Sequence, residues 1–193
     1  VRVGGRGVDT ALFDPARRSE ALRERWGAGR DTLTCLYVGR LAPEKNLSLV
    51  QQTFASILAA SGDARMVWVG DGPARKALAT EYAGQIEHHF AGTRTGEDLA
   101  AHYASADLFL FPSLTETYGN VVAEAMASGL AVVAYRSAAA AELIACGENG
   151  VTVAPGDASA YVAAAVALAA QPLQLKTVAH AARRSILPRS WES

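Results

Sequence analysis

The fold class of this chain is decided by the stretch Leu33-Thr-Cys-Leu-Tyr-Val38-Gly-Arg-Leu-Ala-Pro-Glu-Lys-Asn46. Residues 33–38 form a short, continuously apolar run, which is typical of a strand that is buried on both faces. A loop follows, and residues 47–60 then show helical periodicity, with Asn46 as the candidate N-cap. The stretch therefore predicts one strand–loop–helix unit of a sheet that is covered on both sides.

The same kind of unit recurs along nearly the whole chain. We expect strands at residues 66–69, 86–90, 107–112, 130–134 and 150–153, and helices at residues 74–82, 96–104, 120–128, 138–145, 158–170 and 173–185. This alternation predicts an α/β fold with a Rossmann-like, doubly wound parallel sheet. Ligands of such sheets bind at the carboxyl ends of the strands, so the loops that enter the helices are the functional candidates.

Length and charge limit the classes of protein that need to be considered. A chain of 193 residues accommodates one large α/β domain and is too short for two full ones. Its 18 Lys and Arg residues against 19 Asp and Glu residues give a formal net charge of −1. A nucleic-acid-binding protein usually carries a basic excess, so we expect no nucleic-acid partner.

Cysteine and histidine residues give no sign of a metal or redox site. Cys35 and Cys146 are far apart and have no metal-ligand spacing, which favours a reduced, cytoplasmic chain. His88 and His89 are adjacent on an expected strand, so their rings point to opposite faces and do not chelate one ion. We expect no bound metal, no other cofactor and no membrane span. The opening VRVGGRGVDT has no initiator Met and resembles the middle of a longer protein.

The loop at residues 39–46 is the first candidate site. It places Arg40 and Lys45 directly after a strand and before a helix. Two cations beside a helix N-terminus form a suitable seat for a diphosphate. The alternative is that both are solvated loop charges, or that they pair with Glu44. The loop contains neither of the common glycine-rich phosphate motifs.

The loop at residues 112–119 and the helix after it form the second candidate site. A phosphate could approach the free backbone amides of Gly119, Asn120 and Val121 at the helix start. Glu116 stands just before this helix and Glu124 about one turn inside it. Two such carboxylates suit hydrogen bonding to vicinal hydroxyls of a sugar and a ribose. The alternative makes Glu116 a favourable N-terminal helix acid and Glu124 a surface residue.

Four motifs occur in a specific order, and together they carry a family resemblance. They are Val38-Gly-Arg-Leu-Ala-Pro-Glu-Lys45, Val69-Gly-Asp-Gly-Pro73, Pro112-Ser-Leu-Thr-Glu116-Thr-Tyr-Gly119 and Glu124-Ala-Met-Ala-Ser-Gly129. The series resembles the family 4 type of retaining glycosyltransferases, which have the GT-B fold of two Rossmann-like domains with the active site between them. Glu116 and Glu124 stand in that family's E-x7-E spacing.

The ends of the chain extend this resemblance. Gly7-Val-Asp9 with Phe13-Asp-Pro15 resembles the start of the family's C-terminal domain, and Trp191-Glu192 resembles the segment that crosses back toward the N-terminal domain. The resemblance implies that residues 1–193 are the nucleotide-sugar (donor) binding C-terminal domain, and that the N-terminal acceptor domain is absent from this chain.

The resemblance also implies roles for individual residues. Arg40 and Lys45, with the amides of residues 119–121, would hold the donor diphosphate, and Glu116 would contact the transferred sugar. Glu124 would bind the ribose, and Arg94 would line the nucleobase pocket. One segment departs from the family: where Gly-Gly-x-x-Glu is common, the chain reads Tyr135-Arg-Ser-Ala-Ala-Ala-Ala-Glu142. We expect donor contacts by bare glycine backbone to be missing there.

The expected function is transfer of a glycosyl group from a nucleoside diphosphate sugar, GDP-mannose or a UDP-sugar, to an acceptor hydroxyl with retention of configuration. The acceptor, a glycan or a lipid, would be bound mainly by the N-terminal domain, so the isolated chain would be inactive. Peripheral association of the full-length protein with the inner face of the membrane, through that N-terminal domain, is compatible with this function. Two alternatives stay open: a GT-B relative of other chemistry, such as a sugar-nucleotide epimerase or a glycosyl phosphorylase, and a non-catalytic nucleotide-binding module.

Overall fold

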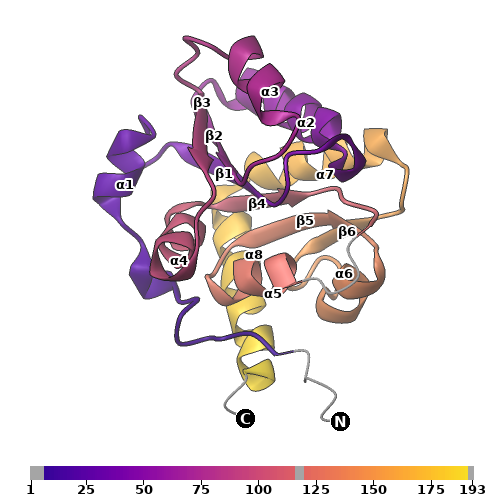
Figure 1. Ribbon diagram of the computed structural model, residues 1–193. Helices are drawn as coiled ribbons and strands as arrows, with labels where there is room; N and C mark the ends of the chain where they lie inside the picture. The colour runs from indigo at the N-terminus through magenta and orange to yellow at the C-terminus, as the bar shows by residue number, and fades with distance from the viewer. Residues whose placement is uncertain (1–6, 116–119, 191–193) are drawn as a thin grey trace.

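A parallel sheet forms the centre of the computed structural model, which describes residues 7–115 and 120–190 (Figure 1). Within these residues the sheet has six strands, in the order β3-β2-β1-β4-β5-β6. The strands are β1 (Leu33–Val38), β2 (Ala64–Val69), β3 (His88–Gly92), β4 (Leu108–Phe111), β5 (Ala131–Tyr135) and β6 (Val151–Val153). The predicted Rossmann-like, doubly wound parallel sheet is confirmed.

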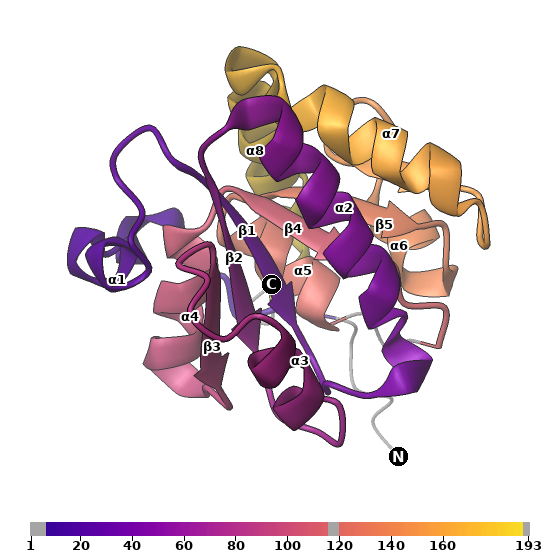
Figure 2. The ribbon, with the colours of Figure 1, turned by 90° about the horizontal axis from the view of Figure 1, so that it is seen from above.

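Helices cover both faces of this sheet. They are α1 (Glu20–Arg25), α2 (Leu47–Ser61), α3 (Arg75–Glu81), α4 (Gly96–Ser105), α5 (Asn120–Ala127), α6 (Ala138–Leu143), α7 (Ala158–Ala169) and α8 (Pro172–Ile186), with short 3-10 turns at Pro15–Arg17, Pro43–Lys45 and Leu187–Arg189. Figures 1 and 2 show α2 and α7 side by side over one face, and α4, α5 and α8 cover the other.

The continuous apolarity of the strands is explained by their burial. Every residue of β4 and β5 is buried, and so are the last five residues of β1. Within the described residues no single helix is long and apolar enough to span a bilayer. The bent pair at residues 158–169 and 172–189 meets the length and composition criteria only when its helices are joined.

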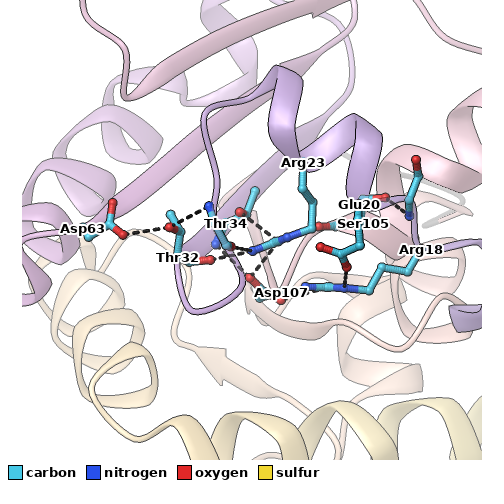
Figure 3. A network of polar contacts seen from close by, with 10 residues as sticks. Arg18, Glu20, Arg23, Thr32, Thr34, Asp63, Ser105 and Asp107 are labelled. Atoms are coloured by element: carbon cyan, nitrogen blue, oxygen red, sulfur yellow. Dashed lines mark hydrogen bonds and ion pairs between the residues drawn. The ribbon is translucent and has the colours of Figure 1, made fainter.

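Helix α1 was not predicted from the sequence, and it brings a charged side chain into the interior. Ser19 caps the helix by accepting from the Leu22 amide at 3.1 Å. The fully buried Arg23 then points to the amino ends of β1 and β4 (Figure 3), where it lies 3.1 Å from Thr34 Oγ1 and 3.4 Å from Asp107 Oδ2. It also donates to three backbone carbonyls. This network lies at the edge of the sheet opposite the carboxyl ends of the strands, so its role is structural.

Candidate functional site

The strand order reverses between β1 and β4, and in open α/β sheets such a reversal opens a crevice at the carboxyl ends of the two strands. These two strands pair in parallel, with Cys35 opposite Leu108 and Leu36 opposite Phe109. Beyond β1 the order runs to β2 and β3, and beyond β4 it runs to β5 and β6. This reversal is the topological switch point at which open α/β sheets bind ligands. The loop at residues 39–46 therefore leaves the sheet beside the chain that follows β4.

A hydrogen bond connects these two loops. Asn46 Nδ2 donates to the carbonyl oxygen of Pro112 at 3.3 Å. Asn46 stands at the N-cap position of α2, as predicted, but its side chain makes no capping hydrogen bond there. Its backbone is left-handed, with φ of 58°, and its side chain is bonded across the crevice. The residue thereby joins the two candidate loops.

The glycines after β2 allow a second loop to lie against the first. The amide of Leu41 donates to the carbonyl of Asp71 at 2.9 Å, and the amide of Gly39 donates to the carbonyl of Val69 at 3.0 Å. A Cβ at Gly70 would overlap the Gly39 carbonyl oxygen. Gly70 is thus needed for the close approach of the two backbones.

Arg40 and Lys45 lie in the first loop, as the sequence indicated. The Arg40 side chain is 64% exposed and forms an ion pair with Glu44, with 3.4 Å between Nη1 and Oε1. This is the pairing that we considered as an alternative to phosphate binding. Because an exposed pair of this kind is worth about 0–1 kcal/mol, it is weak enough to be exchanged for a stronger anionic partner. Lys45 is half-buried in the 3-10 turn just before α2.

Arg40 and Arg94 both line a cavity of about 290 Å³. Its lining residues are Val38, Gly39, Arg40, Val69, Gly70, Asp71, Thr93 and Arg94. The Arg94 guanidinium is held in place by the Ala91 carbonyl, at 2.7 and 2.9 Å, and by Asp98 at 2.9 Å. The structure therefore brings Arg94 to the same cavity as the β1 loop.

The first residues of α5 and Glu124 border a second cavity, of about 350 Å³. Its lining residues are Gly7, Val8, Asp9, Phe13, Asn120 and Glu124. Asn120 and Val121 open α5, and Glu124 lies one turn further on, half-buried rather than on the open surface. Burial raises the pKa of Glu124 to about 7, while a hydrogen bond from Tyr103 acts in the opposite direction. Glu116 and Gly119 lie outside the described residues.

One wall of the second cavity comes from the N-terminal segment, and Arg183 of α8 holds that segment in place. Arg183 donates to the carbonyl oxygens of Phe13 at 2.8 Å and of Ala127 at 2.7 Å, and it pairs with Asp14 at 2.7 Å. One guanidinium thus joins the first segment, the end of α5 and the last long helix. Sequence reasoning missed Arg183, because its partners are distant in the chain and three of them, at Thr10, Phe13 and Ala127, are backbone carbonyls.

The charged and metal-ligating side chains of the two cavities decide which ions this site could hold. In the described part of the chain, no group of three or more His, Cys, Asp and Glu side chains is arranged to hold a metal ion. The charged groups that line the two cavities are Arg40, Asp71 and Arg94 in the first, and Asp9 and Glu124 in the second.

The strand order and its switch point define the chain as a Rossmann-like α/β domain. The family model described as "Glycosyl transferases group 1" matches residues 32–171, and the chain belongs to this family. A GDP-mannose-dependent alpha-mannosyltransferase of Mycobacterium tuberculosis is 40% identical over 96% of this chain and 46% of its own length. The chain spans about half the length of the curated relatives that it matches.

Solved structures agree with this assignment. The Anabaena protein HepE, determined in complex with UDP-glucose, is 26% identical with a TM-score of 0.79, over 95% of this chain and 51% of HepE. The C-terminal domain of a group 1 glycosyl transferase from Francisella tularensis is 21% identical with a TM-score of 0.78. That comparison covers 95% of this chain and 98% of the Francisella domain, and at this identity it shows a shared fold.

Proposed function

We propose that the chain is the donor-binding domain of a glycosyltransferase, which transfers a glycosyl group from a nucleoside diphosphate sugar to an acceptor hydroxyl with retention of configuration. The observation that carries this proposal is the meeting of two loops at the β1–β4 switch point, joined by the hydrogen bond from Asn46 to Pro112. A diphosphate in this crevice would meet Arg40 and Lys45 from one side. It would meet the backbone amides at the start of α5 from the other.

The proposed catalytic contribution of this domain is electrostatic. Negative charge grows on the diphosphate as the bond to the sugar breaks, and preorganised cations and amide dipoles stabilise that charge. Arg40 and Lys45 would supply the cations, so we propose that a divalent ion is not required. Glu116 would contact the transferred sugar. Transfer that persists in the presence of a chelator would support this part of the proposal, and loss of transfer that is restored by Mg²⁺ would contradict it.

The nucleoside would occupy the two cavities near this crevice. Glu124 would accept hydrogen bonds from the ribose hydroxyls, which is supported by its position in the wall of the second cavity. Arg94 would contact the nucleobase, which is supported by its fixed guanidinium beside the β1 loop. A planar guanidinium stacks well on aromatic rings, which suits it to that role.

The names of the similar proteins favour GDP-mannose as the donor, because several of them are GDP-mannose-dependent mannosyltransferases. A UDP-sugar is the alternative, as in the HepE complex. We propose that a second domain binds a glycan or lipid acceptor, which is consistent with relatives about twice as long as this chain. The complete protein would act in the cytoplasm, peripherally at the inner face of the membrane.

Titration calorimetry with GDP, UDP and the matching nucleosides tests this proposal on the 193-residue chain. We expect one diphosphate to bind, and Arg40→Ala to weaken it about ten- to hundredfold while free nucleoside binding changes little, because a charge-assisted hydrogen bond is worth about 1.5–3 kcal/mol. Arg30→Ala is the matched control, since this exposed arginine precedes β1 at the opposite edge of the sheet. Unchanged diphosphate affinity in Arg40→Ala would show that Arg40 is a solvated loop charge and not a ligand of the diphosphate.

Product analysis on the two-domain protein tests the reaction itself. We expect a glycosylated acceptor whose new anomeric linkage has the configuration of the donor, as read by nuclear magnetic resonance. An epimerised nucleotide sugar or a sugar phosphate would identify one of the alternative chemistries. Binding without any turnover would identify a nucleotide-binding module.

A further inference from the structure

Glu124 needs a partner that its own helix does not provide. The side chain is half-buried in the wall of the second cavity, where burial removes much of the water that would otherwise stabilise its ionised form. Among residues 7–115 and 120–190, a single hydrogen bond to its carboxylate is found, and it arrives at Oε2 from Tyr103 on α4 at 3.0 Å. The same residues give no hydrogen bond to Oε1.

Tyr103 is held firmly enough to direct that carboxylate. Its side chain is fully buried. The ring lies edge-on to Phe13, with 5.7 Å between ring centroids and an interplanar angle of 85°, and its centroid is 5.8 Å from that of Phe109. Phe109 belongs to the central strand β4, and Phe13 lines the same cavity as Glu124. The hydroxyl is therefore fixed by packing on both sides, and its position depends little on Glu124 itself.

We propose that Tyr103 is a positioning residue for donor binding: its hydroxyl holds Glu124 by Oε2 and leaves Oε1 directed to the ribose hydroxyls of the nucleoside diphosphate. This inference rests on the proposed function, and it assigns a residue outside the four motifs that carry the family resemblance. Tyr103 does not touch the donor. It acts through Glu124, by fixing the rotamer of the carboxylate and favouring its ionised form.

The surroundings of Glu124 contain other charged groups, and none of them replaces this hydroxyl. Asp9 of the N-terminal segment lines the same cavity and is an acid. Arg183 of α8 contacts α5 at the Ala127 carbonyl, about one turn beyond Glu124. Glu142 belongs to α6, which packs against α5, and forms an ion pair with Arg189 at 3.2 Å. The pKa of Glu124 is set by burial, which raises it, and by the Tyr103 hydrogen bond, which lowers it.

The substitution Tyr103→Phe removes the hydroxyl and keeps the ring. Without that donor the pKa of Glu124 is expected to rise further above 7, because the bond stabilises the ionised carboxylate. A larger fraction of Glu124 is then protonated near neutral pH, and a protonated acid is a poorer acceptor for two vicinal hydroxyls. The loss of affinity should therefore depend on pH, and raising the pH should reverse most of it.

Tyr161→Phe is a matched control for loss of a buried hydroxyl. Tyr161 is also fully buried, and its hydroxyl donates to the Val133 carbonyl at 2.8 Å on another part of the sheet. Both variants remove one oxygen from the interior and keep an aromatic ring. A merely structural effect would appear in both variants and would not change the pH profile of binding.

The experiment titrates the chain and the two variants with GDP and UDP at pH 6.5 and pH 9, and it follows the Glu124 carboxyl by ¹³C nuclear magnetic resonance without nucleotide. For the diphosphate that the wild-type chain binds, we expect Tyr103→Phe to lose about tenfold in affinity at pH 6.5 and less than about threefold at pH 9. The reason is that a rise of one unit in the pKa of Glu124 lowers its ionised fraction at pH 6.5 about tenfold. The pKa of Glu124 should be higher in Tyr103→Phe than in the wild-type chain.

Three results would overturn the inference: an unmoved pKa of Glu124 in Tyr103→Phe, an equal loss of affinity at both pH values, or the same loss in Tyr161→Phe. The proposed function and the positioning role fail in different ways. Failure of the wild-type chain to bind either diphosphate contradicts the proposed function. Normal binding together with an unmoved Glu124 pKa contradicts the positioning role alone.

Discussion

The substitution Glu124→Gln should stabilise the chain, and only at neutral to alkaline pH. Burial raises the pKa of Glu124 to about 7, compared with an ordinary value of 4.5. Because the folded pKa is the higher one, the stabilising contribution of this carboxyl is fully present below about pH 4.5, and it is lost as the pH rises through 7. At about 1.4 kcal/mol for each pH unit between the two pKa values, the ionised side chain costs about 3 kcal/mol above pH 8.

Glutamine keeps the volume of the side chain and an acceptor for the Tyr103 hydroxyl while it removes the charge. We therefore expect Glu124→Gln to raise the free energy of unfolding by about 3 kcal/mol at pH 8.5 and by less than about 0.5 kcal/mol at pH 4.5. Urea unfolding followed by circular dichroism at the two pH values measures this difference. A buried carboxylate that lowers stability is consistent with selection for binding rather than for folding.

Glu148→Gln is the control for the general effect of removing an acid. Glu148 is exposed, and its side chain makes no hydrogen bond or ion pair with the described residues. As an exposed surface substitution, this variant should change the free energy of unfolding by no more than about 0.5 kcal/mol. A stability difference for Glu124→Gln that is the same at pH 4.5 and pH 8.5 would refute the reasoning, because it would mean that Glu124 titrates as a solvated acid.

Two further predictions concern buried groups at the amino edge and in the core of the sheet. Asp107→Asn should lower the free energy of unfolding by about 3 kcal/mol, measured by urea unfolding, because it leaves the buried charge of Arg23 without its acidic partner; a change below about 1 kcal/mol would show that backbone carbonyls alone satisfy the guanidinium. Burial raises the pKa of the Cys35 thiol well above its usual range, whereas Cys146 is exposed. A thiol reagent at pH 8 should therefore modify Cys146 in the folded chain and Cys35 only after unfolding, and mass spectrometry that finds Cys35 modified first would contradict this expectation.

Much of the fold was accessible from the sequence because its signals are local. A strand that is buried on both faces is mostly apolar without alternation, as residues 33–38 are apart from Thr34, and an amphipathic helix repeats its apolar residues every turn. Each expected strand and helix occurs in the structure, with ends shifted by one or two residues in most cases. The strand expected at residues 86–90 begins two residues later, at His88. Helix α1 was missed because its sequence is dominated by charged residues.

The candidate loops were also predictable, since a loop between a strand and a helix of such a sheet opens at its carboxyl edge. The sequence therefore placed Arg40, Lys45 and Arg94 at this edge without any coordinates. It also placed Glu124 one turn inside a helix. Whether these residues bind a nucleotide sugar is a proposal that the binding experiments test.

Sequence periodicity alone determined which segments are strands and helices, and the order of motifs determined the family. Only the tertiary structure decided which strands are neighbours, and hence that the 39–46 loop meets the chain after β4. It also decided that Arg23 is buried, that Arg183 holds the N-terminal segment against α5, and that Tyr103 reaches Glu124. The physical reason is range: periodicity reports how each residue meets its local surroundings, whereas these contacts depend on packing between segments that are distant in the chain.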